Sequence, residues 1–333
     1  MAEPLNLQTD VVRQHTVPRF LLKHFSTPVK GKRLRLYAFD KATGRPYATT
    51  PDDATVRNTF YNLDNHPQRL SLEPLLGIYE HEAAPVIAGL LGHKDIRRLT
   101  DDDRYRLAVF VAVQRARTFG ELERISGMIS VLTDKMEAIG STEEQAFEAL
   151  GLLSEGATRD IFLRQLVQQM SHIDHLLNKD WYLMETSPEH PFYVSDNPVV
   201  LKNSNDFGPY GNIGLAVPGI QIYLPLSSTL LLAMYCPSIR EQKVRQKQDI
   251  HHLLARAPEL MPRHIRPFEL LEHLGRFTDY LLMPLTPEHV THYNALQVEY
   301  AEQYVFCGEN EFSLVERMLA ADDRYRTGPR LTF

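Results

Sequence analysis

The sequence has few cysteines and no long hydrophobic run. Two cysteines, Cys236 and Cys307, occur among 333 residues, which is too few for a disulfide framework and is typical of a reducing cytoplasm. Both lie in apolar, strand-like segments, where a buried free thiol is expected. No run approaches the roughly 18 apolar residues of a membrane-spanning helix, and the first residues lack the apolar segment of a signal peptide. We therefore expect a cytoplasmic protein without a membrane partner.

A net positive charge is also absent. The formal net charge is -6 and the sequence pI is about 6.2, so there is no bulk basic surface to attract nucleic acid, and such binding would need a local patch. With 43% hydrophobic and 23% charged residues, the composition is that of a globular protein able to bury a large core.

Familiar catalytic motifs are missing: the chain has no P-loop, GxSxG elbow, HExxH pair or CxxC pair. His172 and His175 stand one helical turn apart, a spacing that permits two imidazoles on one metal, but a polar helix face is the simpler interpretation. Glu241 and Lys243 form a Glu-x-Lys sequence downstream of Asp196, superficially like that of some nucleases. The pattern around them predicts the exposed start of a helix, so no nuclease site is assigned there.

The order of apolar patterns predicts an α+β protein. The first half is largely helical with an N-terminal β-hairpin, and the second half is a mixed or antiparallel sheet flanked by helices. We expect the hairpin, with strands near 34–38 and 45–49, to pack back onto that sheet. Helices are predicted over 71–91, where Pro85 should kink or divide the helix, and over 143–152 and 159–177. The expected organisation is a flexible lead-in (1–13), a single domain (14–320) with a helical part (about 71–178) and a sheet-containing part (about 179–308), and a polar tail (321–333).

One predicted helix is buried along its middle and polar at its end. Thr100 is a suitable N-cap, and residues 107–113 are apolar on all sides, which is typical of a central helix. The same face continues into Gln114 and Arg117. A buried guanidinium is costly unless it is paired, so Arg117 requires a carboxylate or a bound anion.

The stretch 189–201 contains the main functional candidate. A short β-prone run, 192–194, is followed by Ser195-Asp196-Asn197-Pro198, and a second apolar run, 199–201, begins at once. Strands that stop and restart around polar residues usually place those side chains at a sheet edge or a pocket wall. Asp196 is therefore the residue most strongly indicated for function.

Polar residues that interrupt buried patterns have two interpretations. In the first, they form a structural network in which Arg117 pairs with Glu80 or Asp196, and Asp196 caps its own turn. In the second, they line one pocket, with His15 as acid or base, Asp196 and Glu80 as bases or ligands of a divalent metal, and Arg117 as an anion clamp. The candidate site is His15, Glu80 and Asp196 for catalysis, and Arg19, Gln114, Arg117, Ser195 and Asn197 for substrate or anion binding.

Two segments together resemble the "domain of unknown function 4238" family of mostly bacterial proteins. They are Gln14-His15-x-x-Pro18-Arg19-Phe20-x-Leu22-x-x-Phe25 and Ser195-Asp196-Asn197-Pro198. Further similarities are Phe60-Tyr61, the helix from Leu72-Glu73 to Glu80, Gln114 with Arg117, Trp181 and Pro225-Leu226-Ser227, so the resemblance spans about residues 14 to 308. It implies one family domain and no particular reaction, because the family is named for lacking one.

Two function classes follow. The first is a hydrolase of the phosphodiesterase or nuclease type, acting on a phosphate-containing substrate through the His/Asp/Glu/Arg pocket. The second is a non-catalytic sensor or partner-binding protein, as in bacterial defence or stress, in which the polar cluster is structural. The sequence names no cofactor and leaves both classes open.

Overall fold

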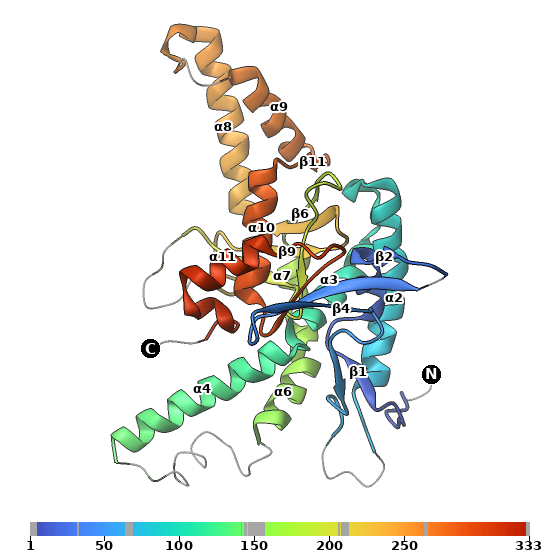
Figure 1. The fold of residues 1–333 in the computed structure, drawn as a ribbon. Coiled ribbons are helices and arrows are strands. Elements are labelled where there is room, and N and C mark those ends of the chain that lie inside the picture. The colour runs from blue at the N-terminus through green and yellow to red at the C-terminus, as the bar shows by residue number, and fades with distance from the viewer. Residues whose placement is uncertain are drawn as a thin grey trace.

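The computed structural model describes residues 5–31, 33–63, 69–140, 142, 145, 157–205, 207, 213–262 and 266–330. The strands of these residues form two five-stranded sheets and one two-stranded ribbon (Figure 1), and helices flank them, which confirms the predicted α+β class. The helix predicted over 143–152 lies outside the described residues. In the described ranges, no helix combines the length and apolar character needed to cross a membrane.

The first sheet holds the most deeply buried strands. Its order is β11 (Met283–Pro284), β6 (Asp180–Glu185), β10 (Leu230–Tyr235), β9 (Gln221–Pro225) and β8 (Val200–Lys202). The β11–β6 pair is parallel and the other pairs are antiparallel. Every residue of β10 is buried, so both faces of this sheet must be covered.

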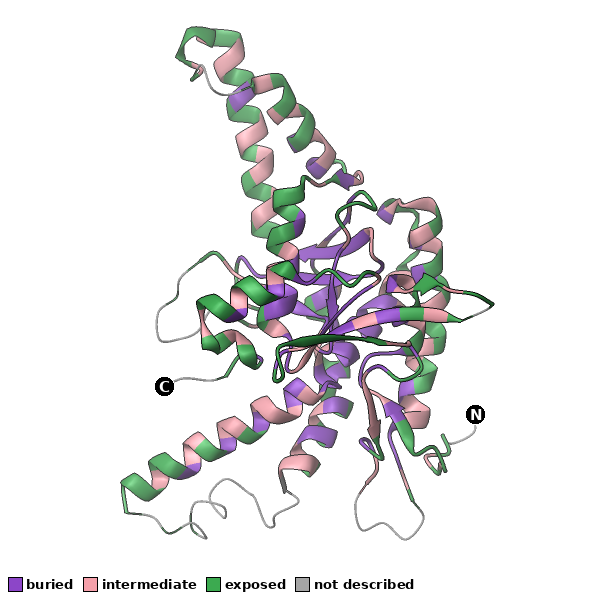
Figure 2. Cartoon of the chain, viewed as in Figure 1, coloured by how far each residue is buried: buried purple, intermediate pink, exposed green. Residues whose placement is uncertain are grey.

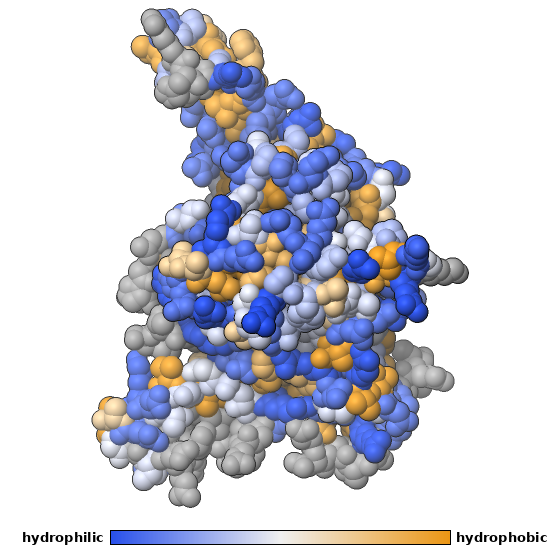
Figure 3. Space-filling model, viewed as in Figure 1, coloured by the Kyte–Doolittle hydropathy of each residue, from blue (hydrophilic) through white to orange (hydrophobic). Residues whose placement is uncertain are grey.

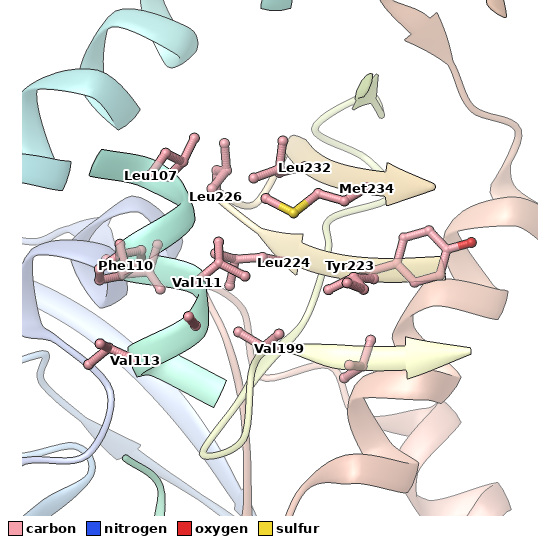
Figure 4. Packing of buried hydrophobic residues seen from close by; sticks show 14 of the residues in the cluster. Leu107, Phe110, Val111, Val113, Val199, Tyr223, Leu224, Leu226, Leu232 and Met234 are labelled. Atoms are coloured by element: carbon pink, nitrogen blue, oxygen red, sulfur yellow. The ribbon is translucent and has the colours of Figure 1, made fainter. Parts of the chain in front are cut away.

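Helices provide that cover on each side. On one face, Leu107 and Val111 of α3 (Asp101–Ala116) lie against Leu226 and Leu224 (Figure 4). On the other face, Tyr182 of β6 stacks on Phe277 of α9 (Pro267–Thr278) with ring centroids 4.2 Å apart. Because successive side chains along a strand point to opposite faces, the sheet can pack against α3 on one face and against α9 on the other.

The second sheet was not predicted as a separate unit. Its path is β2 (Thr27–Pro28), β3 (Leu34–Asp40), β12 (Tyr304–Cys307) and β7 (Val194–Ser195), with β4 (Arg45–Thr49) paired to β3. The predicted hairpin is therefore present as β3–β4, but it joins β12 and β7 instead of packing on the first sheet. Phe39, Val305 and Phe312 form the core between this sheet and α11 (Ser313–Ala321).

The two-stranded ribbon ties the N-terminal segment to the domain. It consists of β1 (Arg13–His15) and β5 (Val56–Asn58). The segment before residue 14, which the sequence suggested as a flexible lead-in, also makes backbone hydrogen bonds. The Leu7 carbonyl accepts from Ser71 N at 2.9 Å, and the Val12 carbonyl accepts from Thr59 N at 2.7 Å.

In the sequence, the main helical region lies between strand β5 of the ribbon and strand β6. Its members are α2 (Glu73–His93), α3, α4 (Phe119–Ala138), α6 (Ala157–Gln168) and α7 (Ile173–Leu177), after the short α1 (Arg19–Leu22). Pro85 lies inside α2, which continues through it as one helix, so the expected division does not occur. The helix predicted over 159–177 is instead interrupted by a 3-10 turn at Gln169–His172.

Helix α3 is central, as its sequence predicts. Thr100 and Asp103 form a reciprocal capping box, with Asp103 N donating to Thr100 Oγ1 and Thr100 N donating to Asp103 Oδ2, each at 3.1 Å. Residues 107–114 are all buried. The helix ends at Ala116, and Thr118 caps α4 by accepting a hydrogen bond from Glu121 N.

An arm of two helices projects from the body of the molecule (Figure 1). It consists of α8 (Pro237–Arg256) and α9, which precede α10 (Pro287–Tyr300), and its residues are mostly exposed or half-buried (Figure 2). Apolar surface is visible at its outer end (Figure 3), where the segment between the helices includes the exposed Leu260.

The two cysteines are both free thiols in different surroundings. Cys307 is buried in β12, as predicted, and burial raises the pKa of its thiol to about 11. Cys236 instead precedes α8 and is partly exposed, so the prediction that it is buried in a strand was wrong.

Candidate functional site

Residues Ser195–Pro198 carry the chain from one sheet to the other, and we call them the corner. Strand β7 ends at Ser195 and pairs with β12, whereas β8 begins at Val200 and pairs with β9. Ser195 Oγ donates to Gln297 Oε1 at 2.9 Å, and Gln297 Nε2 donates to the Pro198 carbonyl at 2.9 Å. The polar interruption seen in the sequence is thus a junction between two sheets, fixed against α10.

The Asp196 carboxylate holds the turn from α10 into β12. It accepts backbone hydrogen bonds from Glu302 and Gln303 at 2.8 Å and from Tyr304 at 3.0 Å, and the residue is only 5% exposed. Burial raises the pKa of Asp196 to about 6, although the three N–H groups and the ammonium of Lys41 favour the ionised form. Asp196 therefore has a structural function and can also exchange a proton near neutral pH.

Arg117 is enclosed by protein partners. Its Nη1 lies 2.6 Å from Glu80 Oε1, its Nη2 donates to the His15 carbonyl at 2.7 Å, and its Nε donates to the Tyr61 hydroxyl at 3.3 Å. The side chain is 1% exposed, and that of Glu80 is 25% exposed. Of the two partners considered for Arg117, the structure selects Glu80. Each nitrogen of the guanidinium already has a partner, so this group is poorly suited to clamp a substrate.

Two buried amides fasten the ribbon beside this ion pair. Gln114 Nε2 donates to the Thr16 carbonyl at 3.0 Å. Gln14 accepts from Tyr61 N at 2.7 Å through Oε1 and donates to Asn62 Oδ1 at 3.0 Å through Nε2. The Gln-His opening of the sequence therefore lies against both α3 and the Phe60-Tyr61 segment.

His15 and Glu73 complete a cluster with Arg117 and Glu80. Burial lowers the pKa of His15, and its Nε2 atom is enclosed without a hydrogen-bond partner among the described residues. Burial raises the pKa of Glu73 to about 7, and the charges of Arg117 and Glu80 act on it in opposite directions. Glu73 was absent from the predicted site, although its position seven residues before Glu80 places both carboxylates on one side of α2.

The predicted site residues fall into separate groups. Arg19 pairs with Asp52 at the surface, with Nε 2.6 Å from Oδ1. Within the described ranges, no hydrogen bond or ion pair joins Asp196 to His15, Glu80 or Arg117. The two groups are linked through neighbouring residues by a hydrogen bond of 3.0 Å from Thr118 Oγ1, next to Arg117, to Asn197 Oδ1. The candidates therefore do not form one shared pocket.

A different arginine shares a cavity with Asp196. This cavity has a volume of about 230 Å³, and its lining includes Asp196, Arg57, Tyr47 and Tyr304. The Arg57 guanidinium carbon lies 3.3 Å from the centroid of the Phe119 ring, a cation–π contact that fixes the charge in place. Burial lowers the pKa of Arg57, and the Asp196 carboxylate opposes this effect. We call this cavity the Arg57–Asp196 pocket.

The two tyrosines of this pocket are suited to donate hydrogen bonds. The Tyr47 and Tyr304 rings meet edge to face, with centroids 6.3 Å apart. Burial raises the pKa of both hydroxyls, which keeps them protonated. Sequence reasoning missed Arg57 because nothing in the local pattern of 56–58 predicts a strand. Only the pairing of β5 with β1 places this arginine beside the corner.

The family comparison agrees with the resemblance found in the sequence. Residues 13–311 match the family model described as "Protein of unknown function (DUF4238)". The chain belongs to this family. No curated protein and no solved structure matches the chain. The match includes the Gln-His opening, the Arg117 cluster, the Arg57–Asp196 pocket and the corner, so all these features lie within the family domain.

The remaining motifs of the sequence lie elsewhere. Lys243, with His273 and His289, lines a larger cavity of about 1050 Å³ beside α8 and α9. The rings of His172 and His175 stack with centroids 6.2 Å apart. Among the residues that the structure describes, no three His, Cys, Asp or Glu side chains are grouped so that they could hold a metal.

Proposed function

We propose that the protein binds the phosphate group of a small molecule in the Arg57–Asp196 pocket and hydrolyses its ester bond. The proposal rests on the burial of Arg57 and on its lack of an ion-pair partner in the part of the chain that the structure describes. Its side chain is half-buried against Phe119, and no ion pair or side-chain hydrogen bond engages it within the described residues. A half-buried cation without an ion-pair partner is costly, and a phosphate group matches the forked geometry of a guanidinium.

Asp196 supplies the proton transfer that the reaction needs. A carboxylate has about four lone-pair positions. Three of those of Asp196 accept backbone hydrogen bonds, and the residue lines the cavity. With a pKa of about 6, Asp196 is suited to accept a proton from the attacking water and to return it to the leaving oxygen. Water oxygen bonds to phosphorus, the ester P–O bond breaks, and Arg57 with Tyr304 balances charge on the phosphate oxygens.

The test compares substrate binding and turnover in matched variants. Phenyl phosphate binding is measured by calorimetry, and hydrolysis of para-nitrophenyl phosphate and bis(para-nitrophenyl) phosphate by absorbance. Arg57→Gln should weaken binding and kcat/KM about 10- to 100-fold, since it removes a charged hydrogen bond. The control is Arg45→Gln on the exposed strand β4, which should behave as the natural protein does. Equal binding by Arg57→Gln would refute the proposal.

A non-catalytic binding protein is the second candidate. It is favoured by the three backbone hydrogen bonds to Asp196, because a carboxylate used to fix a turn need not take part in chemistry. This candidate predicts that phenyl phosphate binds through Arg57 and that neither nitrophenyl ester is hydrolysed. Hydrolysis of either ester that is lost in Arg57→Gln would instead show that the protein is an enzyme.

A further inference from the structure

The corner has a second cavity on its other side. Asp196 faces the Arg57–Asp196 pocket, whereas Asn197 lines a separate cavity of about 390 Å³. This second cavity lies between the start of α4, Tyr300 at the end of α10 and the segment Gly328–Arg330. We call it the Arg115 cavity. Of the candidate residues from the sequence, Asn197 lines this cavity, and the proposed hydrolysis does not involve it.

Three arginines line the Arg115 cavity, and two of them are neutralised. Arg124 engages Glu121 through both Nε and Nη2, at 2.8 and 2.6 Å. Arg330 engages Glu302 through Nη1 and Nη2, at 2.8 and 2.5 Å. Such two-point pairs are strong and geometrically specific. Glu121 and Glu302 are therefore each neutralised by an ion pair with one of these two arginines.

Arg115 is the remaining cation of this lining, and no carboxylate forms an ion pair with it among the described residues. Its Nη2 atom donates a hydrogen bond to Gln169 Oε1 at 3.4 Å, which is long for such a contact. Its Nε atom is buried without a partner among the described residues. The cavity therefore has one positive charge in excess, and that charge belongs to the guanidinium of Arg115.

The rest of the wall is largely apolar. Val199 and Leu201, on either side of the start of β8, are 1% and 5% exposed, and Pro329 also lines the cavity. Asn197 is fixed at this wall, because its amide nitrogen donates to the Tyr300 carbonyl and its oxygen accepts from Thr118. The volume lies at the lower end of the range for small-molecule sites, about 300–1,000 Å³.

From this arrangement we infer that the Arg115 cavity binds a small organic acid. Its carboxylate lies against Arg115, and its hydrocarbon part lies against Val199, Leu201 and Pro329. A single unpaired guanidinium matches a monocarboxylate in charge and in its two-point geometry. The other two arginines are already paired, so the free charge of the cavity matches that of one carboxylate. This site is independent of the proposed hydrolysis, because Arg57 and Asp196 do not line it.

The test uses hexanoate as the probe and hexanol as its neutral counterpart, with binding measured by calorimetry. Hexanoate should bind the full-length protein and hexanol should not. Arg115→Met should lower hexanoate affinity about tenfold or more and leave phenyl phosphate binding unchanged. The control is Arg106→Met, on the surface of the same helix, where the arginine pairs with Asp102. It should bind hexanoate normally.

The opposite results would overturn the inference. Failure of hexanoate to bind the natural protein excludes the site, as does equal affinity in Arg115→Met. If Arg115→Met does not fold, Arg115→Lys replaces it, because that variant keeps the charge and loses the forked geometry. It should weaken hexanoate binding several-fold, and unchanged affinity would again count against the site. Loss of phenyl phosphate binding in either folded variant would refute the claimed independence of the two cavities.

Discussion

Glu73→Gln should stabilise the protein above pH 7 and have little effect near pH 4. Burial raises the pKa of Glu73 from 4.5 to about 7 in the folded protein. A carboxyl whose pKa is raised by folding contributes stability that is present below the unfolded pKa and is lost as the pH rises through the folded pKa. The penalty therefore develops between pH 4.5 and about 7. It corresponds to roughly 3 kcal/mol, which partial solvent access reduces to about 2 kcal/mol.

The assay is urea unfolding followed by fluorescence across that pH interval. Trp181 is the single tryptophan and is 1% exposed, so its emission should report loss of the core. The control is Glu82→Gln, at an exposed position of the same helix, whose stability should follow that of the natural protein at every pH. Glutamine cannot ionise, so only the pH-dependent part of the difference tests the argument. A difference between Glu73→Gln and the natural protein that stays constant with pH would refute it.

Three further changes test the structural contacts by the same urea assay. Glu80→Gln removes the carboxylate facing Arg117, 2.6 Å away, and should cost about 3 kcal/mol; a loss below about 1 kcal/mol would contradict a buried pair. Asp196→Ala leaves three backbone donors without their acceptor and should also cost about 3 kcal/mol, whereas unchanged stability would show that the turn does not depend on it. Thr100→Ala removes the capping box and should cost about 1 kcal/mol, an effect that Asp102→Ala, outside the box, should not reproduce.

The sequence was most informative where local chemistry determines the structure. Thr100 followed by three acidic residues predicted the start of α3, and the apolar run from Leu107 predicted its burial. Because a buried guanidinium needs a partner, the sequence predicted an ion pair for Arg117, and Glu80 was one of the two carboxylates proposed. These inferences hold because caps, amphipathic periods and charge burial act over short distances along the chain.

The pairing of the strands could not be predicted from the local sequence in the same way. The runs before and after the corner have similar composition, yet β7 and β8 belong to different sheets. Strand pairing is decided by partners distant in the sequence, such as β12, about a hundred residues beyond β7. The local sequence therefore identified Asp196 as a candidate, whereas its neighbours in the pocket, Arg57, Tyr47 and Tyr304, were missed.

Arg57 illustrates the same limit within the site. It belongs to a three-residue strand, and nothing adjacent to it in the sequence distinguishes it from a surface arginine. Its position depends on pairing with β1 and on stacking over Phe119, sixty-two residues away. Arg117, by contrast, stood out in the sequence because it ends a buried helix, but its contacts leave no nitrogen without a partner.

A crystal structure of the protein grown with phenyl phosphate would test the central claim most directly. The account predicts phosphate density in the Arg57–Asp196 pocket, with phosphate oxygens within hydrogen-bonding distance of the Arg57 guanidinium and a water or ester oxygen near Asp196. Crystals of the Arg57→Gln variant grown with the same compound should lack that density. Phosphate bound at another site, or bound equally in the variant, would contradict the account.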